Sequence, residues 1–260
     1  MELLVKYETD EKVSIVTLNR PTKLNALSKE LRLQLVEAFC KADDDPATCV
    51  VILRGEGRSF CVGYDITGGD PAKEAWKHDA LKWHENLRES LALELMPWDM
   101  KKPVIASVQG HALGGGCELA MLCDITIAAS DASFGEPEVR FSNLGPAIVM
   151  PWLIGFKKAR ELLYMGDSIN AEEALRLGMI NKVVPVDELR VATLKFARRM
   201  TLISRSTHSH NVCSMTCSWK AVTSSSESGL LLVRRASTQP SARNCFTTLF
   251  AGTSITQRMC

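Results

Sequence analysis

The sequence lacks a long apolar run and an excess of charge of either sign. No stretch of about 18 apolar residues occurs, so no segment is predicted to cross a bilayer as a helix. Lysine and arginine number 31 and aspartate and glutamate 30, which gives a formal net charge of +1. Such a chain has no overall basic field that would hold nucleic acid or an anionic membrane. We therefore predict neither partner and expect small-molecule chemistry.

The sequence also lacks a recognisable targeting segment and an even set of cysteines. Its first residues enter an alternating strand pattern, without the apolar core of a signal peptide or the Arg- and Ser-rich character of a transit peptide. The nine cysteines include five in apolar, core-like settings: Cys40, Cys49, Cys61, Cys117 and Cys123. Buried free thiols are typical of a reducing compartment. We predict a cytoplasmic protein without a disulfide framework.

Strand and helix patterns alternate along residues 1–203. The first part predicts a hairpin of strands 3–7 and 13–18, a helix with Ser28 as N-cap, a strand at 49–53, and a helix at 73–96 whose apolar face holds Trp76, Ala80, Trp83, Leu87, Leu91 and Leu95. The second part predicts strands at 103–108, 124–129 and 181–184, and helices at 147–154, 157–165, 171–177 and from the N-cap Asp187 to 199. This order indicates an α/β fold of repeated β-β-α units followed by helices.

The composition changes at about residue 204. Residues 204–260 hold 12 Ser and 8 Thr but one acid, Glu227, so the other 29 of the 30 acids lie before them. Reading each codon from the third base of one residue into the next turns Met215-Thr216 into Asp and Trp219-Lys220 into Glu. We therefore predict that 204–260 is translated out of the ancestral frame and is poorly ordered, because it has no periodic apolar face to offset its ordering entropy.

A glycine triplet followed by a glutamate is the first candidate for chemistry. Gly114-Gly115-Gly116-Cys117-Glu118 stands at a predicted strand-to-helix junction. Glycines let another group approach the backbone closely, and a helix N-terminus offers unpaired N–H groups to a developing anion. The phosphate-loop patterns G-x-x-x-x-G-K-[ST] and G-x-G-x-x-G do not occur there. Alone, the triplet is as compatible with a tight packing turn as with a site.

Two further segments carry polar groups in loops. In Phe60-Cys61-Val62-Gly63-Tyr64-Asp65-Ile66 a glycine precedes a residue whose N–H would serve as a second donor. In Gly135-Glu136-Pro137-Glu138 two carboxylates flank a rigid proline. Taken singly, the first is an ordinary turn, and the second is more typical of a surface charge or an N-cap.

Together, in order and spacing, these segments resemble the crotonase superfamily and are most similar to an enoyl-CoA hydratase. The resemblance also includes Asn19-Arg20-Pro21 and Asn25-Ala26-Leu27, and it covers about residues 3–203. It implies the crotonase (ClpP-like) spiral of β-β-α units. It also implies a C-terminal region that forms trimers, often paired into hexamers, so a homo-oligomer is expected if 204–260 permits one.

The resemblance implies roles for particular residues. The N–H groups of Tyr64 and Gly115 form an oxyanion hole for a thioester carbonyl, and Glu118 and Glu138 are the catalytic pair. The acyl-CoA substrate is expected to contact these residues: Arg20, Lys23, Asn25, Ala26, Leu27, Cys61, Gly63, Asp65, Ile66, Gly114 and Pro137. Arg20, Lys23 and Arg58 are candidates for the CoA phosphates, although they also fit solvated surface charges.

The expected reaction is reversible addition of water to a 2-enoyl-CoA. Negative charge builds up on the carbonyl oxygen, one carboxylate takes a proton from water and the other gives one to the α carbon. We assign Glu118 to water and Glu138 to the α carbon; the two roles are exchangeable. Residues 144–151 depart from the Pro-Gly-x-Gly-Gly that hydratases often carry, which leaves the acyl group open. A carnitinyl-CoA-like dehydratase, an isomerase and a silent acyl-CoA-binding protein remain alternatives.

No cofactor is expected beyond the CoA carried by the substrate, and no metal is expected. The cluster His208, His210, Cys213 and Cys217 offers four ligands, but its spacing matches no common zinc module. Water addition of this type requires no metal.

Overall fold

The structure is a computed structural model that describes residues 2–66, 79–141 and 149–203. These residues belong to the compact unit Met1–Ser209. Up to the glycine triplet, the elements are β1 (Val5–Asp10), β2 (Val13–Leu18), the 3-10 turn η1 (Pro21–Lys23), α1 (Lys29–Asp44), β3 (Val50–Gly55), α3 (Ala80–Glu94), α4 (Met96–Asp99), β4 (Val104–Val108) and β5 (His111–Leu113).

From the triplet onward, the elements again alternate between helices and short strands. They are α5 (Gly115–Leu122), β6 (Ile125–Ala129), β7 (Ser133–Gly135), the 3-10 turn η2 (Pro137–Phe141), α6 (Met150–Ile154), α7 (Phe156–Met165), β8 (Ser168–Asn170), α8 (Ala171–Leu177), β9 (Lys182–Val184), the 3-10 turn η3 (Val186–Glu188) and α9 (Leu189–Met200).

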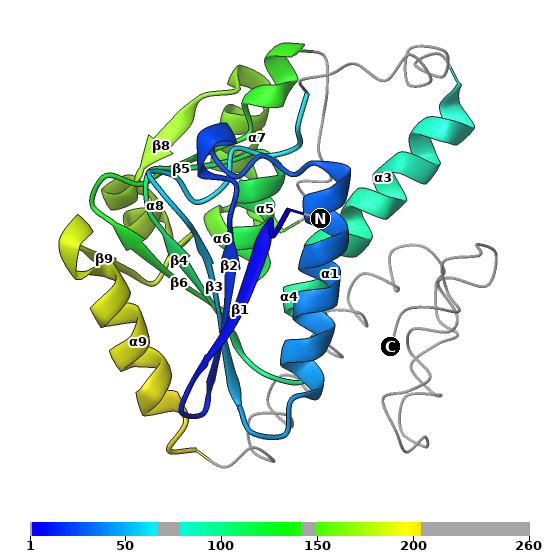
Figure 1. The fold of residues 1–260 in the computed structure, drawn as a ribbon. Coiled ribbons are helices and arrows are strands. Elements are labelled where there is room, and N and C mark those ends of the chain that lie inside the picture. The colour runs from blue at the N-terminus through cyan, green and yellow to red at the C-terminus, as the bar shows by residue number, and fades with distance from the viewer. Residues whose placement is uncertain (1, 67–78, 142–148, 204–260) are drawn as a thin grey trace, which may run out of the picture. The chain divides into compact units, whose positions relative to one another are not determined.

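A six-stranded sheet forms the centre of the unit (Figure 1). Its strand order is β1-β2-β3-β4-β6-β9, with β1 antiparallel to β2 and all other neighbours parallel. The hairpin turn is shorter than predicted, since only Glu11 and Lys12 separate β1 from β2 and Glu11 takes a positive φ of 53°.

Both faces of this sheet are covered, which explains why its inner strands are apolar at nearly every position. On β2, Val13 and Ile15 belong to the core on the side of α9, while Val16 and Leu18 belong to the larger core on the side of α1. Adjacent residues of a strand point to opposite faces, so this alternation follows from the period of two. Full burial of such side chains stabilises the fold by about 1.5–3 kcal/mol each.

A second, three-stranded sheet brings the candidate segments together. Its order is β5-β7-β8, with β5 parallel to β7 and Leu113 level with Gly135. The Gly114 N–H donates to the Gly135 carbonyl oxygen at 2.9 Å. Because β5 runs into α5 and β7 runs into η2, the glycine triplet and the second glutamate segment emerge side by side.

Helix boundaries follow the sequence signals in α1 but not in α9. The Ser28 side chain accepts from the Leu31 N–H at 3.3 Å, so the predicted N-cap of α1 is confirmed. The predicted N-cap Asp187 is wrong. It lies inside η3, and α9 begins two residues later, after Glu188, which makes no side-chain cap bond. The 3-10 turn η3 leads directly into α9, so the helix begins without a side-chain cap.

The predicted apolar face of residues 73–96 is wrong at Leu87, whereas Leu95 is partly buried and packs against the core. The helix α3 begins after Asp79, whose side chain accepts from the N–H groups of residues 81 and 82. Leu87 is 37% exposed, whereas Ser90 and Glu94 are buried. Trp76 lies outside the described residues. The helix therefore turns Ser90 and Glu94 toward the interior together with Leu93.

The structure bears differently on the predictions for the C-terminal region, for the cysteines and for membrane-spanning helices. The frame-shifted and poorly ordered region 204–260 lies outside them, as do His208, His210, Cys213 and Cys217. The five described cysteines, Cys40, Cys49, Cys61, Cys117 and Cys123, are free thiols. In the part of the chain that the structure describes, no helix is long and apolar enough to span a bilayer.

Candidate active site

The N-terminus of α5 requires glycine at successive positions. Gly114 has φ 52° and ψ −130°, a conformation that disfavours other residues. A Cβ on Gly116 would lie 2.3 Å from the Cys61 carbonyl oxygen, and a Cβ on Gly115 would lie 2.6 Å from the Tyr64 ring. The triplet therefore allows the loop of residues 61–64 to pack directly on the start of the helix.

The two predicted oxyanion donors meet at this junction. The bridge between Leu27 and Tyr64 uses the Gly63 carbonyl and the Asp65 N–H, so the Tyr64 N–H points away from Leu27. An ideal Cβ on Gly63, whose φ is 89°, would lie 3.4 Å from the Gly115 nitrogen. Among the described residues, neither the Tyr64 nor the Gly115 N–H donates to a backbone carbonyl. Two backbone donors are thus held close together.

The predicted acid/base pair comes from the two elements that the small sheet aligns. Glu118 is fully buried on the first turn of α5, and Glu138 is half-buried on η2. The Glu138 carboxyl packs against Gly114, with its Oε2 3.0 Å from where a Cβ on that glycine would stand. Both glutamates therefore lie beside the glycine triplet.

Two further carboxyl groups share this site, and the sequence did not predict their roles. Glu136 is 1% exposed, and burial raises its pKa well above the usual value. The charges of Glu118, Glu138 and Glu94 raise it further. Glu94 is 0% exposed, and burial raises its pKa to about 8, with the Glu138 charge acting in the same direction. The site is a cluster of four carboxyl groups.

Glu94 reaches the site from α3 and is hydrogen-bonded to Tyr64, one of the two predicted oxyanion donors. The Tyr64 hydroxyl donates to Glu94 Oε1 at 2.8 Å. This oxygen also lies 3.3 Å from where a Cβ on Gly115 would stand. Glu94 was detectable as the lone charge in the apolar run 91–96, where a helix turning inward would bury it.

Several predicted substrate contacts hold the loops of the site in place. Arg20 Nη1 pairs with Asp65 Oδ2 at 2.5 Å and donates to the Ala26 carbonyl at 3.1 Å. The buried Asn25 side chain donates to the carbonyls of residues 56, 59 and 60 and accepts from the Arg20 N–H. These bonds give Arg20, Asn25 and Asp65 a bracing role; their contact with substrate stays a prediction.

The remaining predicted contacts differ in access to solvent. Ala26, Leu27 and Cys61 are buried, and burial raises the pKa of the Cys61 thiol to about 12, so that it stays protonated. Pro137 is half-buried at the start of η2. Lys23, Arg58 and Ile66 are exposed. An exposed cation is free to meet a phosphate, which keeps Lys23 and Arg58 as candidates.

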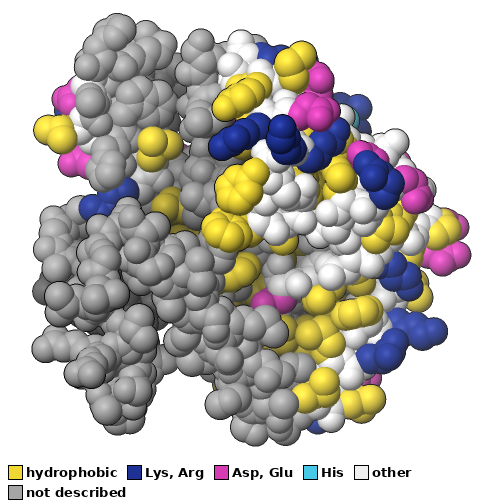
Figure 2. Space-filling view, turned by 180° about the vertical axis from the view of Figure 1, so that it is seen from behind, with side chains coloured by type: hydrophobic (Ala, Val, Ile, Leu, Met, Phe, Trp, Pro, Cys, Tyr) yellow, Lys and Arg dark blue, Asp and Glu magenta, His cyan; other side chains and the backbone are white. Residues whose placement is uncertain are grey.

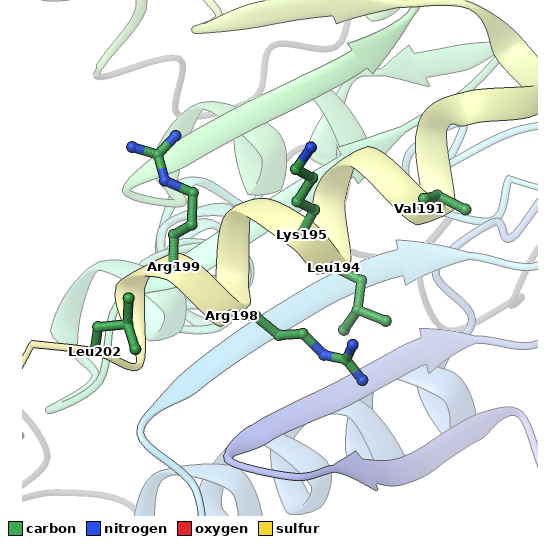
Figure 3. Close-up of a pocket in the computed structure, with 6 residues that line it drawn as sticks. All are labelled: Val191, Leu194, Lys195, Arg198, Arg199 and Leu202. Atoms are coloured by element: carbon green, nitrogen blue, oxygen red, sulfur yellow. The ribbon is translucent and has the colours of Figure 1, made fainter.

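The site offers carboxylates and backbone donors but no metal centre in the described residues. Within 2–66, 79–141 and 149–203, no three His, Cys, Asp or Glu side chains are arranged to hold a metal ion. A cavity of about 420 Å³ lies along α9, on the far side of the large sheet from α5 (Figure 3). It is lined by Val191, Leu194, Lys195, Arg198, Arg199 and Leu202, which include no carboxylate, thiol or hydroxyl group.

The enoyl-CoA hydratase/isomerase family model matches residues 8–223. The chain belongs to this family. Its match to the enoyl-CoA hydratase/isomerase model extends 20 residues past the predicted boundary at 203. A crotonyl-CoA hydratase from Syntrophomonas wolfei is 43% identical over 199 residues, which cover 74% of each chain. A short-chain-enoyl-CoA hydratase from Clostridium acetobutylicum is 38% identical over 204 residues, 75% of this chain and 74% of the relative.

Solved structures of the enoyl-CoA hydratase/isomerase family share the fold. A crystal structure of an enoyl-CoA hydratase/isomerase from Xanthobacter autotrophicus Py2 has a TM-score of 0.78 and 34% identity, and covers 85% of this chain and 81% of its own. An enoyl-CoA hydratase from Bacillus anthracis has a TM-score of 0.74 and 29% identity, with 82% of both chains covered. The predicted superfamily, fold class and enoyl-CoA hydratase activity are confirmed by these matches.

Proposed function

We propose that this chain hydrates a 2-enoyl-CoA thioester reversibly, with Glu118 and Glu138 as acid/base pair and the N–H groups of Tyr64 and Gly115 as oxyanion hole. The observation that carries this assignment is the pairing of β5 with β7, which sets α5 and η2 side by side. This arrangement supports a site in which two carboxyl groups and two backbone donors act on one substrate, as water addition requires.

The chemistry divides among these groups as follows. The thioester carbonyl oxygen accepts from the two N–H groups, and each such donor typically stabilises the developing charge by about 3 kcal/mol. Glu118 takes a proton from water while the water oxygen bonds to the β carbon. Glu138, protonated, gives its proton to the α carbon. Its place against Gly114 keeps it close to the helix start.

The CoA part of the substrate needs cations on the surface. Lys23 and Arg58 are exposed near the loop that carries Asn25, and we propose that they meet the CoA phosphates. Arg20 is less suited to this role because it is engaged by Asp65. We propose no cofactor or metal, and the cytoplasmic location stays a prediction.

We also propose assembly into trimers or hexamers. Exposed large apolar residues include Trp152, Phe156, Tyr164 and Met165 on α6 and α7. Figure 2 shows hydrophobic side chains spread among lysines and arginines on the face in view. Exposed apolar surface of this kind favours burial against another protein. Sedimentation of the purified chain, compared with a frame-restored version, tests assembly and the proposed frame shift together.

Loss of the enoyl absorbance of crotonyl-CoA on incubation with the chain tests the activity. Turnover with formation of the 3-hydroxyacyl product supports the proposal. Turnover of a 3-enoyl-CoA into a 2-enoyl-CoA, without hydration, would indicate an isomerase, and preference for carnitinyl-CoA would indicate a dehydratase. Tight acyl-CoA binding without turnover of any of these would indicate a silent binding protein.

A further inference from the structure

We propose that Glu94 is a positioning residue that fixes Tyr64 through its hydroxyl group, and that a negative charge on Glu94 beside the oxyanion hole blocks hydration. This inference rests on the proposed function, because it assigns Glu94 a role in charge stabilisation at that site.

The position of Glu94 next to both proposed donor residues supports the role. Glu94 Oε1 accepts the Tyr64 hydroxyl proton at 2.8 Å. The same oxygen lies 3.3 Å from where a Cβ on Gly115 would stand. Glu94 therefore contacts the side chain of one donor residue and occupies the space beside the Cα of the other. A shift of its carboxyl group would be transmitted to the loop that carries the Tyr64 N–H.

Burial explains why the proton stays on Glu94. Its side chain is 0% exposed, and Oε2 is buried with no hydrogen-bond partner among the described residues. A buried carboxylate without compensating partners is costly, so the neutral acid is favoured. The pKa of Glu94 is accordingly raised to about 8, by burial first and by the Glu138 charge second, while the Tyr64 hydrogen bond opposes this rise.

The charged and titratable groups around Glu94 do not reverse this preference. A charge on Glu138, on η2, opposes a charge on Glu94. A charge on Glu94 in turn raises the pKa of Glu136, which carries no positive charge that would favour ionised Glu94. The Cys61 thiol feels the same charge and stays protonated. The cation Arg32, on α1, lies over the Tyr64 ring, with its guanidinium carbon 5.6 Å from the ring centre.

The consequence is an alkaline limit on catalysis. Below about pH 8 the hole is flanked by a neutral acid, so charge on the thioester oxygen is stabilised by the two N–H groups. Above that pH, a carboxylate beside Gly115 opposes the same charge, because like charges a few ångströms apart repel strongly in a buried site. The rate should then fall about tenfold per pH unit, as for loss of one essential proton.

The pH profile of kcat for crotonyl-CoA tests this proposal in the full chain. Glu94→Gln keeps an acceptor for Tyr64 and cannot ionise, so its alkaline limit should disappear or move up by a pH unit or more. Tyr64→Phe keeps the backbone N–H and removes the bond that lowers the Glu94 pKa, so its limit should move to higher pH. Glu89→Gln, an exposed glutamate on the same helix, is the matched control and should keep the wild-type profile.

Failure of this inference differs from failure of the proposed function. If the wild-type chain turns over crotonyl-CoA and Glu94→Gln has the same alkaline limit as wild type, the role of Glu94 is overturned and the hydratase assignment stays intact. Absence of wild-type turnover would instead overturn the function. Carbon-13 NMR titration of labelled glutamates, with Glu94→Gln to assign the signal, then tests Glu94 directly, and a pKa below about 6 would overturn the proposal without reference to activity.

Discussion

The Glu138 carboxyl group lies against Gly114 so closely that a Cβ on this glycine would stand 3.0 Å from Oε2 and 3.2 Å from Oε1. The contact is possible because Gly114 has a positive φ and no side chain. It joins Gly114, the residue that precedes α5, to Glu138, the second member of the proposed acid/base pair. The glycine triplet thus shapes both the donor site and the position of a carboxylate.

Gly114→Ala should lower kcat by tenfold or more. The added methyl group pushes the Glu138 carboxyl away, and small displacements of a reacting group are costly, about 10²-fold for 1 Å. Gly155→Ala is the matched control, since Gly155 also has a positive φ but an added Cβ there meets nothing within 4 Å. Both variants should lose stability from backbone strain, about 1–2 kcal/mol. Equal kcat in the two variants would contradict the displacement.

Glu118→Gln and Glu138→Gln should each lower kcat by roughly 10²- to 10⁴-fold, the usual contribution of general acid/base catalysis. The amide keeps the size of the side chain but neither accepts nor donates the transferred proton. The KM for crotonyl-CoA should change little, because the thioester is held elsewhere. Steady-state kinetics with Glu89→Gln as reference provides the check. Near-normal turnover in either variant would remove that glutamate from the mechanism.

The stability of the chain should fall as pH rises from about 5 to 8. In this window folded Glu94, with its pKa raised to about 8, keeps its proton, whereas the unfolded chain, at the usual 4.5, releases it. The unfolded state then binds fewer protons, so the free energy of unfolding decreases by about 1.4 kcal/mol per pH unit from this group. The stabilisation is complete below pH 4.5 and lost as pH passes the folded pKa.

Urea unfolding at several pH values measures this dependence. Glu94→Gln should flatten the curve between pH 5 and 8, although Glu136, whose pKa is raised in the same direction, will leave a residual slope. Glu89→Gln should follow wild type, because its side chain is exposed. Parallel curves for Glu94→Gln and wild type would show that Glu94 ionises normally in the folded chain.

The candidate donors and the candidate catalytic pair could be selected from the sequence because their signals are local. The glycines at 114–116 indicate that another chain segment approaches the backbone closely there, and Glu118 follows on the first turn of the same helix. The pairing of β5 with β7 then determines that Glu138 lies beside the glycine triplet. This pairing joins residues that are distant in the sequence, so it was inferred from the resemblance to a known family and not from periodicity.

Glu94 was not predictable in the same way. The leucines at 87, 91 and 95 recur every four residues, so the pattern favoured their face as the buried one. In the structure Ser90 and Glu94 are buried instead, because α3 packs on α5 with its polar stripe toward Tyr64. A functional site is where a local rule is expected to fail, since a buried carboxyl group is retained there for its chemistry.

Arg20 and Lys23 are both predicted CoA contacts, but we expect Arg20 to hold the loops of the site in place and Lys23 to bind substrate. Arg20→Met should lower the free energy of unfolding by about 1–3 kcal/mol, because it removes a charge-assisted bond and leaves Asp65 partly buried without its cation. Lys23→Met removes a neighbouring exposed cation and should change stability by less than about 0.5 kcal/mol. Its effect should instead be a higher KM for crotonyl-CoA, with kcat retained, if Lys23 meets a CoA phosphate.

Arg20→Met should lower kcat as well, since the Asp65 backbone is the next link after Tyr64 in the loop that carries an oxyanion donor. Urea unfolding and steady-state kinetics on Arg20→Met and Lys23→Met measure the stability and the kinetic constants of each variant. A raised KM with unchanged stability in Arg20→Met would return this residue to the substrate contacts. That outcome would also mean that the hydrogen bonds of Asn25 suffice to hold the loop.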